Sequence, residues 1–241
     1  SSVFTWTTFF SFVIILFILR YRNKIVSFSI KDAIRTCIPF DPLRSQSFHT
    51  DLKIYIIRKL TDFVFLIPGA YVLFLVSNGV YDALSAMGEP IASSGHSPAR
   101  LIAVACTLII AAEFNAFLWH YIEHKIPFLW ELHKVHHSAD NLNPLTNKRS
   151  HSFVQTAKFS MNGFISGVPT GLFMYYYGFG FVELLAISAI ANKILTVATL
   201  DVLRHSHVPL RFGLFEGMFI SPHMHQIHHS SLEVHWDKNF G

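Results

Sequence analysis

The sequence predicts an all-α integral membrane protein with four to five transmembrane helices and a helical cap outside the bilayer. The 241-residue chain is 51% hydrophobic and only 14% charged, whereas average protein usage is about 25% charged. Several apolar runs approach the length of about 20 residues that a membrane helix needs. Thirteen of the fifteen histidines fall between positions 120 and 235, and most of them follow the ends of these runs.

Five apolar runs are candidate spans, in chain order Val3–Leu19, Phe63–Val80, Leu101–Trp119, Phe159–Val182 and Leu184–Leu200. The fourth is rich in glycine and contains Pro169, so we expect it to be kinked or partly re-entrant. Residues 1–60 are therefore predicted to form an N-terminal span and a basic interfacial segment. Residues 61–241 are predicted to form one membrane domain.

The charges of the connecting segments predict the sidedness of the chain. The segment Arg20–Lys59 carries nine Lys or Arg residues and three acids, whereas Asn78–Ala99 carries two acids and no Lys or Arg. The positive-inside rule places the basic segment in the cytoplasm. If each later span crosses the membrane once, residues 120–158 and 204–241 also lie in the cytoplasm. The cap and its histidines are thus expected on the cytoplasmic side, and the excess of positive charge needs no nucleic-acid partner.

Three histidine clusters are spaced by three and four residues, which places imidazoles on one face of a helix. They read His120-Tyr-Ile-Glu-His124, His133-Lys-Val-His136-His137 and His225-Gln-Ile-His228-His229. The run from Leu101 to Lys125 contains no Pro or Gly, so its helix should continue past the membrane. Pro127 and the pair Ser221-Pro222 are suited to the starts of two further helices.

This pattern predicts metal binding, because neutral imidazole is the commonest metal ligand. Eight clustered imidazoles exceed the four ligands of one tetrahedral zinc, so two metals are expected. Glu123 and Glu131 fall between the histidines and are expected to point elsewhere, which favours a nitrogen-rich pair of irons that activates dioxygen over a zinc hydrolase. Further candidates for the metal's surroundings are His151, His205, His207 and Asp201.

Two other classes remain open at this point. A membrane metal transporter or sensor would also be rich in histidine, although transporter sites usually lie near the bilayer midplane. A bis-histidine haem protein would use helical histidines as axial ligands.

The ordered motifs resemble the fatty acid hydroxylase and sterol desaturase superfamily, in a style closest to bacterial members. The resemblance rests on Glu113-Phe-x-x-Phe-x-Trp-His120-x-x-x-His124-x-x-Pro127-x-Leu-Trp130-x-x-His133-x-x-His136-His137-Ser, on Arg204-His205-Ser, on Ser221-Pro222-x-x-His225-x-x-His228-His229-Ser and on Asp237-Lys-Asn239-Phe-Gly241. It covers roughly the second half of the chain. Relatives usually continue past Asn-Phe-Gly, and the chain has no initiator Met, so we expect the natural protein to extend beyond both ends.

The resemblance implies that residues 61–241 are a membrane catalytic domain with a cytoplasmic cap that holds two iron ions. It implies dioxygen-dependent hydroxylation of a fatty acyl, sterol or related lipid, or desaturation as the alternative. The implied ligands are His120, His124, His133, His136, His137, His225, His228 and His229, and His205 and His151 also match histidines of the family. Asp201 stands where some relatives have a histidine, so Asp201 and His207 are candidates from their positions in this sequence alone. Asp237 and Asn239 lie in the matching C-terminal motif and are possible ligands or partners of ligands. The expected partners are a lipid substrate and a separate electron donor, namely a b-type cytochrome, a ferredoxin or a reductase. The expected location is a bacterial inner membrane or the endoplasmic reticulum.

Overall fold

The computed structural model describes residues 44–91, 97–206 and 208–240. Every regular element in these ranges is a helix, and no described residue forms a strand, so the all-α prediction is confirmed. The predicted first span, Val3–Leu19, lies outside the described residues. The described chain divides into two compact units. The first holds residues 44–57, 134–149 and 196–240 apart from 207, and the second holds residues 58–91, 97–133 and 150–195.

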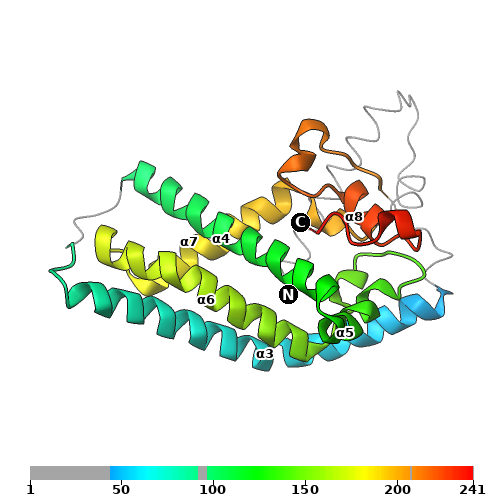
Figure 1. The fold of residues 1–241 in the computed structure, drawn as a ribbon, viewed down its shortest axis with the longest axis horizontal. Helices are drawn as coiled ribbons and strands as arrows, with labels where there is room; N and C mark the ends of the chain where they lie inside the picture. The colour runs from blue at the N-terminus through cyan, green and yellow to red at the C-terminus, as the bar shows by residue number, and fades with distance from the viewer. Residues whose placement is uncertain (1–43, 92–96, 207, 241) are drawn as a thin grey trace. The chain divides into compact units, whose positions relative to one another are not determined.

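The second unit contains the long helices (Figure 1). They are most of α3 (Gln46–Ser85), α4 (Pro98–Lys125), α6 (Ser152–Tyr177) and α7 (Phe181–Ala198). Within the described residues, α3, α4 and α7 are long and apolar enough to cross a membrane. They contain or largely overlap the predicted second, third and fifth spans.

The predicted fourth span overlaps α6, which does not meet the same test of length and apolarity. α6 runs unbroken for 26 residues with Pro169 inside it, and Gly178 ends it in the left-handed conformation at φ 67°. Its kinked or re-entrant path in a membrane stays a prediction. Its lower apolarity follows from a face of small and polar residues that are buried against the protein: Gly163, Ser166, Gly167, Thr170 and Gly171.

That face lets α6 approach α3 closely, and the two helices run side by side (Figure 1). A Cβ atom added at Gly163 would lie 2.5 Å from the Gly69 carbonyl oxygen, and one added at Gly171 would lie 2.5 Å from that of Ser77. Both distances are far inside van der Waals contact, so glycine is required at these crossings. Small residues at such crossings are how membrane helices bring their backbones together.

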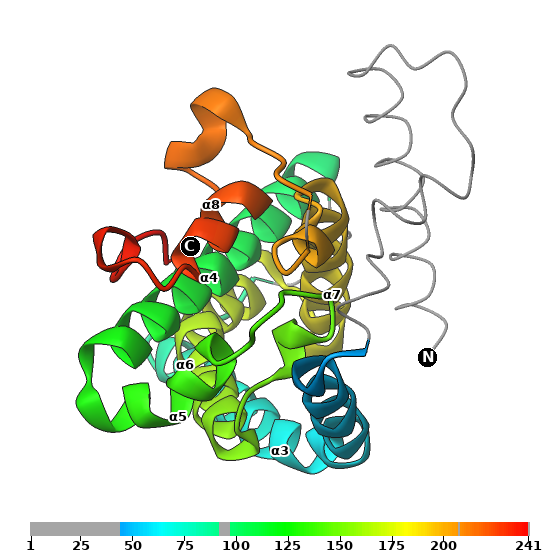
Figure 2. The same cartoon turned by 90° about the vertical axis from the view of Figure 1, so that its right-hand side faces the viewer.

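α4 packs against α6 in the same unit (Figure 2). Val104 and Leu108 of α4 form a buried cluster with Phe179 and Leu184, which lie at the turn into α7 and on α7. Ser97 caps the N-terminus of α4 by accepting a hydrogen bond from the Arg100 backbone N–H, and the helix then runs unbroken for 28 residues to Lys125. The predicted extension of this helix beyond its apolar run is therefore confirmed.

The first unit is built from the start of α3, the end of α5 (Pro127–His137), α8 (Pro222–His228) and short 3-10 helices. Asp51 of α3 is fully buried and forms an ion pair with Arg149. Its other oxygen accepts hydrogen bonds from Asn143 Nδ2 at 2.7 Å and from Thr146 Oγ1 at 2.8 Å. These bonds hold the loop that follows α5, and with it the end of the second histidine cluster.

Candidate metal centre

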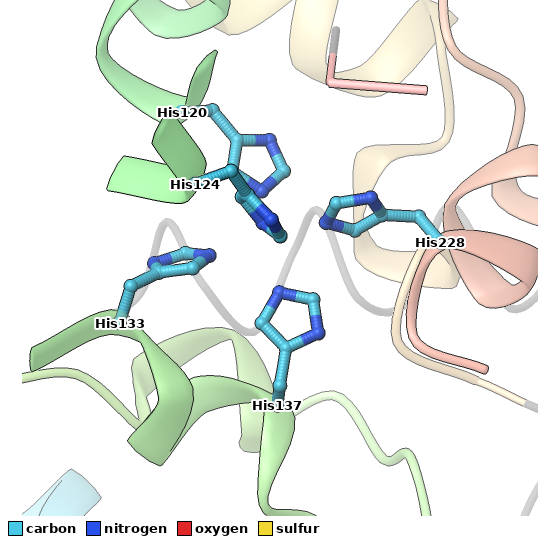
Figure 3. Close-up of side chains that lie close together, drawn as sticks. All are labelled: His120, His124, His133, His137 and His228. Atoms are coloured by element: carbon cyan, nitrogen blue, oxygen red, sulfur yellow. The ribbon is translucent and has the colours of Figure 1, made fainter. Parts of the chain in front are cut away.

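Three histidines of the second unit gather where α4 ends and α5 begins. His120 and His124 are one turn apart on α4, and their ring centroids lie 5.1 Å apart. Pro127 begins α5, as the sequence predicts, and α5 brings the His133 ring to 5.1 Å from His120 and 5.0 Å from His124. Each of the three offers a ring nitrogen within 4.8 Å of the others. Figure 3 shows these three rings turned toward one another.

Two further side chains surround these rings. Glu123, only 5% exposed, places its Oε2 atom 3.2 Å from His133 Nδ1. The expectation that Glu123 points elsewhere is therefore wrong, because the α4–α5 turn brings the next helix over it. The Trp130 ring lies 5.0 Å from that of His124. Sequence reasoning missed the signal for this contact. Asn115, Trp119 and Glu123 follow one another at intervals of four residues on the buried face of α4, so an acid at position 123 should have been expected to face the protein.

Four histidines of the first unit converge more tightly: His136, His205, His225 and His229. His205 Nε2 lies 3.1 Å from the Nε2 atom of His136, 3.0 Å from that of His225 and 3.2 Å from that of His229. The Nε2 atoms of His225 and His229 lie 3.2 Å apart. These residues come from α5, from the segment after the 3-10 helix Asp201–Leu203, and from α8 and the residue that caps it.

Local sequence explains how α8 presents two of these four rings. Ser221 accepts a hydrogen bond from the Met224 backbone N–H and Pro222 starts the helix, so the predicted helix start is confirmed. His229 caps the other end, one turn after His225. Residues four apart share a helix face, which brings both rings to the same side of α8.

Hydrogen bonds alone do not account for the convergence on His205. One ring nitrogen carries either a hydrogen or a lone pair, so His205 Nε2 has no means to form three hydrogen bonds at once. Burial, followed by the charges of Arg204 and His228, lowers the pKa of His205 from 6.5 to about 3. The ring is therefore neutral at physiological pH, which is the form that ligates metals.

The spacing of the four nitrogens fits a shared cation. Imidazole nitrogens bonded to one metal at about 2.1 Å would lie about 3.0 Å apart at a right angle and about 3.4 Å apart at a tetrahedral angle. The observed distances of 3.0 to 3.2 Å fall within this range. The donor set, all nitrogen with no thiolate, suits iron, zinc or copper.

His137 and His228 form a second pair within the first unit. Their ring centroids lie 4.8 Å apart, and both are labelled in Figure 3. His228 Nδ1 lies 2.7 Å from the Lys238 carbonyl oxygen, which makes Nδ1 the donor and leaves Nε2 for a metal. A backbone carbonyl is a common orienting partner of a metal-bound histidine.

The remaining candidates lie outside these groups or outside the described residues. The His151 Nδ1 atom caps α6 by accepting a hydrogen bond from the Phe153 backbone N–H. Asp201 pairs with Arg204 at 3.0 Å. Asp237 and Asn239 have positive φ angles of 55° and 60° in the C-terminal segment, and Asp237 belongs to neither histidine group. His207 lies outside the described residues. The role of these five residues in metal binding stays a prediction.

Comparison with known proteins bears on the whole of this region. The chain is 25% identical over 136 residues to a protein of Rhizobium tropici named ornithine lipid hydroxylase OlsE, and the aligned region covers 55% of this chain. The chain spans about a third (36%) of that relative's length. It is 26% identical over 255 residues to a cholesterol 25-hydroxylase-like protein of Danio rerio, covering 93% of this chain and 94% of that protein. No solved structure matches the chain.

The sequence model of one family, described as fatty acid hydroxylase, matches residues 105–241. This match spans more than half of the 241 residues and includes all three histidine clusters. The chain therefore belongs to the fatty acid hydroxylase family.

Proposed function

We propose that this protein is a dioxygen-dependent, di-iron lipid hydroxylase of the membrane. The observation that carries the proposal is the convergence of four histidine Nε2 atoms within 3.0 to 3.2 Å of their neighbours in a member of a hydroxylase family. Family membership supports an oxidoreductase, and the all-nitrogen donor set is compatible with iron.

We assign the first iron to His136, His205, His225 and His229. The second iron is assigned to His120, His124 and His133, with His137 and His228 as the other histidines of the three clusters. The assignment of His137 and His228 rests on donor chemistry. Three imidazoles are too few ligands for an iron ion, and His137 and His228 are the histidines of the three clusters that no other assignment uses.

The proposed reaction converts a C–H bond, dioxygen, two electrons and two protons into a C–OH group and water. Two iron ions bound by these histidines would supply the redox chemistry that activates dioxygen. The protein's own part is to hold neutral imidazoles in place and to exclude water from them. Burial of His133, His136, His205, His225 and His228 supports that part. The described residues include no haem-attachment motif or flavin fingerprint, so we propose that the electrons come from a separate b-type cytochrome, ferredoxin or reductase.

A lipid substrate is proposed from two features. Both relatives named above carry the names of hydroxylases, one for an ornithine lipid and one resembling an enzyme that acts on cholesterol. In addition, α3, α4 and α7 could cross a bilayer and expose large apolar side chains such as Phe63, Phe114 and Val182. From the charge asymmetry of the connecting segments, we propose that the metal centre faces the cytoplasm, in a bacterial inner membrane or the endoplasmic reticulum.

The test begins with metal content. Protein produced with ample iron and purified in detergent should hold about two irons per chain. The iron-loaded protein, supplied with a reductant, is then incubated under oxygen-18 gas with extracted membrane lipids. A lipid product that is heavier by one labelled oxygen supports the hydroxylase. An alkene without label would identify a desaturase, and stoichiometric zinc that iron does not replace would overturn the redox proposal.

A further inference from the structure

We infer that Glu123 is a positioning residue for one of the two proposed irons, acting through His133. This inference rests on the proposed function, because it concerns the metal that His133 would bind. The juxtaposition is a buried carboxylate of α4 whose Oε2 atom lies 3.2 Å from His133 Nδ1 on α5.

The burial of the pair makes an accidental surface contact an inadequate explanation. Glu123 is 5% exposed and His133 is 8% exposed. A buried carboxylate is costly unless it is paired or hydrogen-bonded. Glu123 therefore requires a donor, and the Nδ1–H group of His133 supplies one.

The contact determines which nitrogen of His133 is available. An imidazole whose Nδ1 donates a hydrogen keeps its lone pair on Nε2, and the hydrogen bond also fixes the rotation of the ring. His133 then presents Nε2 to the position where its ring meets those of His120 and His124, which lie 5.1 and 5.0 Å away. A carboxylate partner also makes the ligating nitrogen more basic, which strengthens the bond to a metal.

Glu123 acts on one metal group only. The other group is formed by His136, His205, His225 and His229, and His133, the partner of Glu123, is not among them. The inference therefore predicts an asymmetric loss: removal of the Glu123 carboxylate weakens the iron that His133 binds and leaves the other iron in place.

The test is iron retention in Glu123→Gln and Glu123→Leu compared with the unchanged protein. Each iron-loaded protein is dialysed against a graded series of chelator concentrations, and the iron per chain is measured by mass spectrometry. Loss of a partner of this kind typically costs about 10- to 100-fold in metal affinity. Glu123→Leu should therefore release one of two irons at about 10- to 100-fold lower chelator activity. Glu123→Gln should lose less, because its amide oxygen still accepts the hydrogen bond.

Glu131→Gln is the matched control. Glu131 is an exposed acid on α5, two residues before His133, so the control removes a charge of the same kind without removing the contact. It should retain both irons as the unchanged protein does. A purely structural role for Glu123 would lower the thermal unfolding temperature of the metal-free protein and would weaken both irons alike.

A double variant tests the route of the effect. If Glu123 acts through His133, adding Glu123→Gln to His133→Ala should not weaken the second iron further. Two outcomes would overturn the inference: unchanged iron retention in Glu123→Leu, or an additive loss in the double variant. Failure of the unchanged protein to bind two irons would instead refute the proposed function, so the two failures are distinguishable.

Discussion

The Nε2 atoms of His136 and His205 lie 3.1 Å apart, although 69 residues separate the two histidines in the sequence. His136 belongs to α5, and His205 follows the 3-10 helix that ends at Leu203. Both rings are buried, at 8% and 4% exposure. A shared cation would satisfy both nitrogens together, so metal binding should stabilise this part of the fold.

Replacement of His205 by alanine should remove one iron from the purified protein. His205 Nε2 lies within 3.2 Å of three other imidazole nitrogens. The alanine variant therefore lacks the nitrogen that contacts those of His136, His225 and His229. We expect about one iron per chain and a fall in lipid hydroxylation of at least about 100-fold, beyond the effect of losing an outer partner. The control is His49→Ala, an exposed histidine on α3. Full iron content in His205→Ala would contradict the assignment.

The metal-free protein should lose stability as the pH falls below about 6.5. The pKa of His205 is lowered to about 3 in the folded state from 6.5 in the unfolded chain. Between these values the unfolded chain binds more protons, so the free energy of unfolding rises with pH. The stability that a neutral His205 allows is present above 6.5 and is lost progressively toward pH 3. Thermal unfolding between pH 7.5 and 5 measures it, and His205→Gln should show a weaker pH dependence.

Replacement of Asp51 by alanine should strongly destabilise the first unit. Asp51 is fully buried, and its loss leaves the buried Arg149 guanidinium without its counter-charge. Breaking a buried pair in this way costs about 3–5 kcal/mol. Arg149 still donates to the Ser47 carbonyl oxygen at 2.7 Å, which does not replace the lost negative charge.

The control for this change is Asp62→Ala. Asp62 pairs with Arg58 one turn away on α3 and is 29% exposed. Arg58 is buried but also donates a hydrogen bond to Ser150 Oγ at 2.7 Å, so the loss of Asp62 should cost less than the loss of the fully buried Asp51. Chemical denaturation in detergent measures both variants. Equal effects for Asp51→Ala and Asp62→Ala would show that the buried network contributes no special stability.

Alanine substitution should have opposite effects at two glycines. At Gly163 the new Cβ atom would lie 2.5 Å from the Gly69 carbonyl oxygen, so α3 and α6 would have to separate. At Gly79, also in a helix, a Cβ atom meets nothing within 4 Å. Gly163→Ala should lower the thermal unfolding temperature, whereas Gly79→Ala should stabilise the helix by about 0.5–1 kcal/mol. Destabilisation by both would mean that the α3–α6 crossing is not the cause.

The sequence by itself determined several of the helices and the family, and it predicted the metal centre. Apolar runs of sufficient length predicted the helices α3, α4 and α7, because each needs only its own residues to form backbone hydrogen bonds. Local signals also located the starts of α5 and α8 at Pro127 and Pro222. The spacing of the clustered histidines predicted a metal centre, and the ordered motifs identified the family.

Only the tertiary structure decided how the histidines are divided between groups. His136 and His137 are neighbours in the chain, yet only His136 joins His205, His225 and His229. Successive residues point about 100° apart around a helix with 3.6 residues per turn, so adjacent rings face different directions. Which direction meets which partner depends on contacts between distant segments, as the 3.2 Å approach of Glu123 to His133 also does. The spacing of residues within one helix carries no record of such contacts, because they arise only when segments that are distant in the sequence pack together.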